Sequence, residues 1–188
     1  MRIVFFGPPG AGKGTQCDRL SDYQTVPHLS TGKMLRATDR SSELGQTVAK
    51  YIDRGQLAPD EIVMPIVERR LLAPDCQTGC LLDGFPRTVN QARMLDDFLA
   101  DQQWQLDLVI DLHAPTEELV SRLLRRAKLE HRPDDTETAI ERRLRIFNEQ
   151  TEPVRRYYGD RNLVREIDAL GSPEQVFDRI RSAVDELR

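Results

Sequence analysis

The chain has 188 residues, of which 31% are charged and 6% aromatic, with a mean hydropathy of −0.53 and a formal net charge of −4. These values predict one well-packed, soluble globular domain with small insertions and exclude a disordered chain. The negative net charge argues against a protein that binds a nucleic-acid polymer through bulk charge. No apolar run approaches the roughly 20 residues that span a bilayer, and the short apolar start lacks a signal-peptide cleavage pattern, so we expect a cytoplasmic protein without a membrane partner.

The first predicted element is a strand from Ile3 to Phe6, which ends abruptly at a glycine-rich turn. The turn has the spacing Gly7-x4-Gly12-Lys13 and leads into a helical pattern. Glycines let the backbone approach a ligand closely, the helix adds free N–H groups at its positive dipole end, and the lysine adds a full charge. We therefore predict that residues 7–15, called the phosphate loop below, hold a nucleotide polyphosphate. The alternative is a glycine-rich turn with a surface lysine.

Further apolar runs alternate with amphipathic segments along the chain and predict strands at Val26–Leu29, Gly79–Leu82, Leu108–Leu112 and Leu163–Ile167. This alternation predicts an α/β fold with a five-stranded parallel sheet, covered by helices on both faces and joined by right-handed crossovers. In such sheets the ligand lies beyond the carboxyl ends of the strands. The phosphate loop, Thr31 and Asp83 all end or follow predicted strands, so we expect them at that edge.

Two helix starts can be predicted from local residues. Ser172, Pro173 and Gln175 give an N-cap, a proline at the first helical position and a capping-box glutamine. The helix that follows should keep one apolar face, formed by Val176, Phe177, Ile180, Val184 and Leu187. Pro65 lies inside a helical pattern that starts near Asp60, so it should kink that helix or displace its start.

Two charged residues near the third strand suit phosphate chemistry. Asp83 ends the strand, and beside a phosphate loop such a carboxylate holds Mg²⁺, often through water; otherwise it caps the next turn. Arg87 follows closely. A guanidinium can grip phosphate oxygens with two parallel hydrogen bonds and cannot lose its charge, although a lone arginine is more often a solvated surface residue.

The residue after Lys13 is Gly14, and the hydroxyl comes one position later, at Thr15. With this departure the loop resembles that of nucleoside monophosphate kinases, and above all the adenylate kinase family. The stretches Leu29–Arg36 and Leu82–Gln91, and the arginine-rich segment Arg122–Arg143, extend the resemblance over nearly the whole chain. It implies reversible phosphoryl transfer from ATP to AMP, giving two ADP, with Mg²⁺ accompanying ATP and with nucleotide homeostasis as the cellular role.

The resemblance also implies which residues form the site. ATP would contact Gly10, Ala11, Gly12, Lys13, Gly14, Thr15, Arg122, Arg126 and Gly171. AMP would contact Thr31, Arg36, Gln56, Leu57, Ala58, Gly84, Phe85, Pro86, Arg87, Gln91, Arg132 and Arg143. The catalytic set would be Lys13, Arg87, Arg126, Arg132 and Arg143, with Asp83 holding Mg²⁺. Without the resemblance, the arginine-rich helices would be interpreted as solvated faces.

Some positions depart from the family pattern or leave two interpretations open. Gln91 either hydrogen-bonds the AMP base or, with Thr88, caps its own helix. Lys33 stands where the pattern has an acidic residue, which should change either the pairing of the loop or the local metal field, and with it the closed geometry of the flap. Ala127 and His131 replace glycines at the edges of the expected lid and should stiffen it. We expect His131 to be exposed, and His28 and His113 to be structural.

The resemblance further implies a core P-loop domain of three layers, formed by residues 1–29, 60–121 and 138–188. A helical AMP-binding flap would comprise residues 30–59, and a short lid residues 122–137. Such a lid has no room for a zinc site, and Cys17, Cys76 and Cys80 do not have four-ligand zinc spacing. We therefore expect buried thiols, no structural zinc and a monomer.

Three other functions fit the sequence less well. A UMP/CMP kinase would share the loop, but that family has alanine where this chain has Thr31 and asparagine where it has Thr88. A nucleotide-gated switch or ATPase would need a water-positioning residue and a partner surface, and the sequence shows neither. A purely structural protein would leave the phosphate-suited arginines unexplained.

Overall fold

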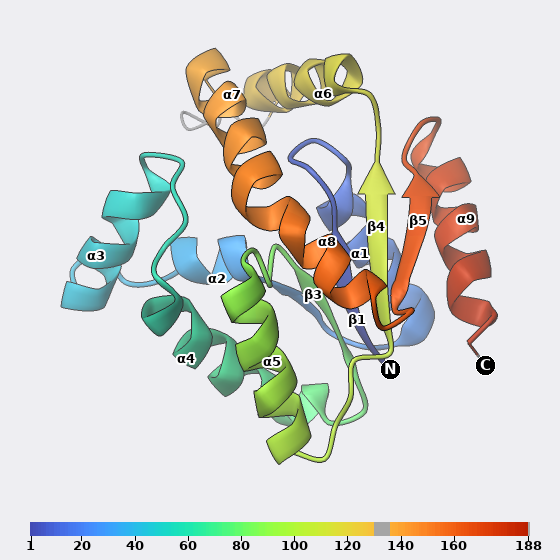
Figure 1. The fold of residues 1–188 in the computed structure, drawn as a ribbon. Helices are drawn as coiled ribbons and strands as arrows, with labels where there is room; N and C mark the ends of the chain where they lie inside the picture. Colours follow the sequence, from blue (N-terminus) through green and yellow to red (C-terminus); the bar gives the residue numbers. More distant parts are fainter. Residues whose placement is uncertain (130–135, 188) are drawn as a thin grey trace.

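The computed structural model describes residues 1–129 and 136–187 and contains one five-stranded sheet in the order β2-β3-β1-β4-β5 (Figure 1). Every strand pair is parallel. The strands are β1 (Arg2–Phe6), β2 (His28–Ser30), β3 (Cys80–Asp83), β4 (Leu108–His113) and β5 (Val164–Asp168). The predicted α/β fold is confirmed.

The helices cover both faces of this sheet, as the alternation of elements predicts. They are α1 (Lys13–Gln24), α2 (Thr31–Arg36), α3 (Glu43–Ile52), α4 (Asp60–Leu71), α5 (Val89–Asp101), α6 (Thr116–Leu129), α7 (Glu137–Ile146), α8 (Glu152–Gly159) and α9 (Pro173–Asp185). A short 3₁₀ turn, Pro74–Cys76, precedes β3. None of the helices within the described residues has the length and apolarity needed to cross a membrane.

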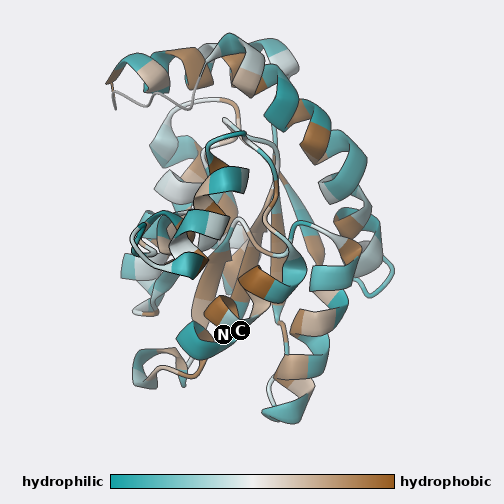
Figure 2. Ribbon diagram, turned by 90° about the vertical axis from the view of Figure 1, so that its left-hand side faces the viewer, coloured by the Kyte–Doolittle hydropathy of each residue, from teal (hydrophilic) through white to brown (hydrophobic). Residues whose placement is uncertain are grey.

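The strands divide their side chains between two apolar clusters because successive residues of a strand point to opposite faces. Val4 and Phe6 of β1 belong to the cluster that also contains residues of α4, α5 and α8. Ile3 and Phe5 belong to the cluster with α1, α6 and α9. Figure 2 shows the resulting layers, with apolar strands between helices whose outer faces are hydrophilic. Burial of each fully buried aliphatic or phenylalanine side chain contributes about 1.5–3 kcal/mol to the stability of the fold. The sheet therefore holds the loops at its edge in place.

Two predicted element boundaries need correction. β2 begins at His28 and not at Val26, because Pro27 has no N–H for the ladder and contributes only its carbonyl, which accepts from Leu81. The last helix begins with the predicted capping box at Ser172, but it ends at Asp185, so Leu187 lies beyond it and is 40% exposed.

The predicted effect of Pro65 on a helix start is not seen. Helix α4 begins at Asp60 and continues through Pro65. The carbonyl that loses its helical partner belongs to Glu61, an exposed residue of the first turn, where water can replace the missing hydrogen bond.

Helices α2 and α3 stand to one side of the sheet, and α6 and the start of α7 lie across the carboxyl ends of the strands (Figure 1). Between α7 and α8 the chain forms a π-helical turn, Phe147–Thr151. Pro153 lies just inside α8 and cannot donate the hydrogen bond that would continue an α-helix through this turn. These elements enclose the space above the phosphate loop.

Candidate active site

The phosphate loop is packed so tightly that two of its glycines cannot be replaced without strain. Gly7 has φ +131° and Gly10 has φ +88°, values that L side chains rarely adopt. A Cβ at Gly7 would lie 2.4 Å from the carbonyl oxygen of Leu112, and one at Gly10 would lie 2.7 Å from that of Leu119. The loop is therefore fixed between the end of β4 and helix α6.

Helix α1 opens onto the cavity without a side-chain cap, because its N-cap residue is Gly12 in the left-handed conformation. The first N–H groups of the helix thus remain available to an anion. Lys13 donates from Nζ to the carbonyl oxygens of Gly7 at 2.7 Å and Pro8 at 2.9 Å, so the ammonium is held across the loop. Burial lowers the pKa of Lys13 to about 8, although the carboxylate of Asp83 opposes this effect.

Asp83 brings a carboxylate to the edge of the sheet beside the phosphate loop. Its Oδ2 lies 3.5 Å from Nε2 of His28, whose Nδ1 lies 2.7 Å from Oδ1 of Asp18. Burial acts to raise the pKa of Asp83, but His28 and the charge of Lys13 outweigh it and hold that pKa below its usual value. Asp83 is therefore ionised near neutral pH and can accept hydrogen bonds or hold a hard cation.

His28 is nearly buried between these two carboxylates. Burial acts to lower its pKa, but Asp83 and Asp18 raise it above the usual value. The imidazole therefore contacts the Asp83 carboxylate and helps to fix its position, which fits the structural role expected for His28. His113 ends β4 and is exposed.

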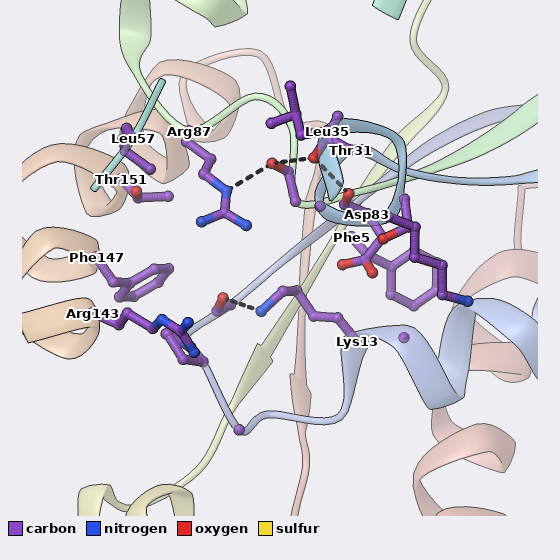
Figure 3. A pocket seen from close by; sticks show the side chains of 18 of the residues that line it. Phe5, Lys13, Thr31, Leu35, Leu57, Asp83, Arg87, Arg143, Phe147 and Thr151 are labelled. Atoms are coloured by element: carbon purple, nitrogen blue, oxygen red, sulfur yellow. Dashed lines mark hydrogen bonds between the residues drawn. The ribbon is translucent and has the colours of Figure 1, made fainter. Parts of the chain in front are cut away.

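Three arginines surround the space opposite Lys13. Arg87 donates from Nε to the carbonyl oxygen of Gly84 at 2.8 Å, which aims its guanidinium into the cavity (Figure 3). Removal from bulk water lowers the pKa of Arg87 and the charge of Asp83 opposes this, while the like charges of Arg143 and Arg36 lower it further. Figure 3 shows Lys13, Arg87 and Arg143 pointing into one space from three different parts of the chain. Such a gathering of cations favours the binding of an anion among them.

Helix α2 is tied to the end of β3. The single hydroxyl proton of Thr31 is shared between two carbonyl oxygens, that of Gly84 at 2.8 Å and that of Asp83 at 3.1 Å. Asp83 is paired with Ser30 in the sheet register, directly before α2. The parallel pairing of β2 and β3 thus places Thr31 next to Asp83, whose carboxylate could hold a metal ion.

The side chain of Gln91 does not form the capping box that its spacing suggested. Thr88 caps α5 by accepting from the Gln91 N–H at 3.1 Å, as predicted. The Gln91 amide accepts from the N–H of Arg87 at 2.8 Å and donates to Oδ1 of Asp60 at 2.7 Å. The Gln91 amide is therefore held in one orientation at the cavity wall, by the loop before α5 and by the start of α4.

The other side of the cavity is bounded by α6. Arg122 donates from Nε to Glu118 at 2.7 Å and from Nη2 to the carbonyl oxygen of Ala169 at 2.9 Å. The first bond lies within α6, and the second joins α6 to the residue that follows β5. Arg126 lies one turn further along the same helix and also faces the cavity.

Lys13, Asp83 and the arginines described above line one cavity of about 760 Å³. It brings together most of the predicted site residues: Gly10, Gly12, Lys13, Gly14, Thr15, Thr31, Arg36, Gln56, Leu57, Ala58, Asp83, Gly84, Pro86, Arg87, Gln91, Arg122, Arg126 and Arg143. Three predicted residues do not line it: Ala11 and Phe85 are buried, and Gly171 is exposed outside it. Arg132 and His131 lie outside the described residues.

Part of the cavity wall comes from residues that the sequence did not indicate. Phe147 and Thr151, from the π-helical turn, both line it. The Phe147 ring lies 5.4 Å from that of Phe6, so the turn packs on the end of β1. Only Pro153 could have signalled an irregular helix here, and it does not indicate which side chains turn inward.

The cysteines lie apart from this cavity. Cys17, Cys76 and Cys80 are free and buried, and burial raises the pKa of Cys17 well above its usual value. Within residues 1–129 and 136–187, no cluster of three or more His, Cys, Asp or Glu side chains could hold a metal ion.

A parallel sheet whose first strand enters a glycine–lysine loop, with further cations gathered above that loop, defines a phosphate-loop nucleotide-binding protein. The model of the family described as adenylate kinase matches residues 5–163. The chain is 44% identical to an adenylate kinase of Leptospira biflexa serovar Patoc (strain Patoc 1 / Ames), over 97% of this chain and 99% of the relative. It is 45% identical to that of Thermobifida fusca (98% of both chains) and 46% identical to that of Maricaulis maris (99% of this chain, 100% of the relative).

The chain therefore belongs to the adenylate kinase family, and its activity is phosphoryl transfer between ATP and AMP. The predicted enzyme class is confirmed. The alternatives of a nucleotide switch or a purely structural protein are set aside.

Proposed function

We propose that ATP binds on the phosphate-loop side of the cavity and AMP on the side of α2 and α5. The observation that carries this proposal is the convergence of Lys13, Arg87 and Arg143 on one space. The backbone N–H groups of the loop and Lys13 would hold the ATP phosphates. Arg122, whose bond to Ala169 places it near residue 171, would flank the adenine.

On the acceptor side, Thr31 and Gln91 would recognise the base and Arg36 the phosphate. Residues 56–58 and 84–86 would supply the surrounding backbone. Gln91 is suited to this role because its amide is held by Arg87 and Asp60 in one orientation. A pre-oriented amide loses little entropy when it pairs with a ligand.

Asp83 fits a magnesium ion that accompanies ATP, because its carboxylate is ionised and shares the cavity with the hydroxyl-bearing Thr15. These oxygen groups are the ligands that Mg²⁺ prefers, directly or through water. When bound, the ion supplies charge neutralisation and alignment of the polyphosphate. We propose no structural zinc.

No side chain needs to act as a nucleophile, because a phosphate oxygen of AMP attacks the terminal phosphorus of ATP and ADP leaves. The protein would align the two phosphates and neutralise the negative charge of the transferred group. Lys13 and Arg126 would act from the ATP side, and Arg87 and Arg143, with Arg132, from between the substrates.

We further propose that residues 30–59 form the AMP-binding flap and residues 122–137 a short lid, and that both close over the substrates to exclude water. The division of the chain is supported by α2 and α3 standing beside the sheet and α6 lying across it (Figure 1). The lid boundary at Arg122 falls inside α6, so closure would move the end of a continuous helix. We propose a cytoplasmic monomer.

The acceptor preference is tested by a coupled assay of ATP with AMP, UMP, CMP and GMP in turn. AMP should give the highest kcat/KM, because Thr31 and Gln91 face the acceptor space. A higher value for UMP or CMP would overturn the proposed acceptor site. Lys13→Ala should remove most activity with an unchanged circular dichroism spectrum, and near-normal turnover would overturn the proposed ATP site.

A further inference from the structure

Asp60 holds the Gln91 amide from a position outside the cavity. It is the first residue of α4, and Gln91 lies in the first turn of α5, the helix that packs beside α4 (Figure 1). Oδ1 of Asp60 accepts from Nε2 of Gln91 at 2.7 Å, and Oδ2 accepts from Nδ2 of Asn90 at 2.7 Å, so both carboxylate oxygens are fixed. Gln91 lines the cavity, whereas Asp60 does not. Asp60 therefore acts on a ligand in the cavity through Gln91.

The chemistry of its two partners favours one orientation of this amide. A backbone N–H can only donate, so the Gln91 atom that lies 2.8 Å from the Arg87 nitrogen is the amide oxygen. A carboxylate can only accept, so the Gln91 atom that lies 2.7 Å from Asp60 is the amide nitrogen. An amide turned over by 180° would place N–H against N–H at Arg87 and oxygen against oxygen at Asp60. Turning therefore loses two hydrogen bonds and creates two repulsive contacts.

An amide held in this way presents a fixed pair of groups to a ligand. After the bonds to Asp60 and Arg87 are counted, one hydrogen of Nε2 and one lone pair of Oε1 remain. The edge of a 6-aminopurine offers an acceptor at N1 and a donor at the exocyclic nitrogen, which complement this donor and this acceptor. A 6-oxopurine in the same pose has a donor at N1 and an acceptor at O6. It could pair with Gln91 only if the amide turned over.

We propose that Asp60 is a positioning residue that sets the acceptor specificity of the enzyme: by keeping the Gln91 amide from turning over, it selects 6-aminopurine monophosphates over 6-oxopurine monophosphates. The inference rests on the proposed placement of the AMP base at Gln91. Of the two bonds that a turned amide would lose, the one to the Asp60 carboxylate is the stronger, because a hydrogen bond to a charged group is roughly twice as strong as a neutral one.

The test compares kcat/KM for AMP with kcat/KM for inosine monophosphate, a 6-oxopurine, in the wild type and in Asp60→Asn. Asparagine keeps the shape of aspartate but can offer an N–H to the oxygen of a turned Gln91 amide. The ratio of the two kcat/KM values should fall about tenfold, the effect of losing one charge-assisted hydrogen bond. The change should lie in KM for the monophosphate, with KM for ATP unaltered.

Glu61→Gln is the matched control for loss of a carboxylate near the start of α4. Glu61 is exposed in the same first turn, so this variant loses the same favourable charge at the helix N-terminus and no bond to Gln91. Its ratio should equal that of the wild type. A second variant, Asp60→Ala, removes the acceptor and should also lower the ratio. If kcat/KM falls by the same factor for both monophosphates in the Asp60 variants, the role of Asp60 is purely structural and the inference is overturned.

Gln91→Leu separates this inference from the proposed function. If Gln91→Leu lowers the ratio of AMP to inosine monophosphate and Asp60→Asn does not, only the inference about Asp60 fails. If Gln91→Leu also leaves the ratio unchanged, the placement of the AMP base at Gln91 fails with it.

Discussion

Replacing Lys13 with methionine should change how the stability of the ligand-free protein depends on pH. In the folded protein the pKa of Lys13 is lowered to about 8 by burial, from 10.5. Between these values the unfolded chain keeps a proton that the folded chain releases, so the free energy of unfolding of the wild type rises with pH across this window. Below the folded pKa, the folded protein bears the full cost of the charged ammonium, about 3 kcal/mol.

Methionine keeps the unbranched side chain up to the ε-carbon and removes the titrating group. The stability of the variant minus that of the wild type should therefore fall by about 3 kcal/mol between about pH 7 and pH 10.5. Loss of the hydrogen bonds to Gly7 and Pro8 changes the free energy of unfolding of the variant by an amount that is the same at every pH, so it does not alter this pH dependence.

Urea unfolding of both ligand-free proteins at a series of pH values measures this difference directly. Lys50→Met, carried through the same series, gives the background for losing an exposed lysine. A difference between Lys13→Met and wild type that stays constant with pH, or that grows as pH rises, would refute the reasoning.

Four other outcomes are expected. Arg87→Ala should weaken transition-state stabilisation, measured from kcat/KM, by about 3–4 kcal/mol, as the loss of other electrostatic donors does. The circular dichroism spectrum should show an intact fold. A loss of rate tenfold smaller than this would place Arg87 outside the reaction. Gln91→Leu should raise KM for AMP more than KM for ATP, whereas Gln102→Leu, at the far end of α5, should change neither; lost stability with unchanged AMP selectivity would instead give Gln91 a purely structural role as the link between Arg87 and Asp60. Chelation of Mg²⁺ should stop turnover and leave the melting temperature of the free protein nearly unchanged, and a large drop accompanied by zinc in the purified protein would contradict this. A mimic of two adenosines joined by five phosphates should slow hydrogen exchange in residues 30–59 and 122–137 more than ATP does, and equal exchange with and without it would contradict closure.

Features encoded by neighbouring residues could be predicted from the sequence. The phosphate loop depends on glycines and one lysine within a few positions, and each has a local backbone reason, such as the positive φ of Gly7 and Gly10. The five strands were predicted because each is a short apolar run between turn signals. The error at β2 arose because Val26 is apolar but precedes a proline that cannot join the ladder.

Features that join distant segments could not be predicted in the same way. The bond between Gln91 and Asp60 spans 31 positions, and that between Arg122 and Ala169 spans 47. No periodicity in the sequence reports such pairs, because they depend on how helices pack. Phe147 lies four residues after Arg143 and so shares its face of the helix, but the sequence does not show that a π-helical turn follows and that Thr151 also lines the cavity.

The Thr31 hydroxyl bears on how the two sides of the cavity are joined. Because Thr31 begins α2 and its acceptors belong to Asp83 and Gly84, helix α2 and the strand end that carries Asp83 share one anchor. The single proton is shared between the two carbonyl oxygens, so an outward movement of α2 would lengthen both contacts together. With the nucleotides placed as proposed, any influence that passes through this anchor from one substrate to the other must be equal in both directions.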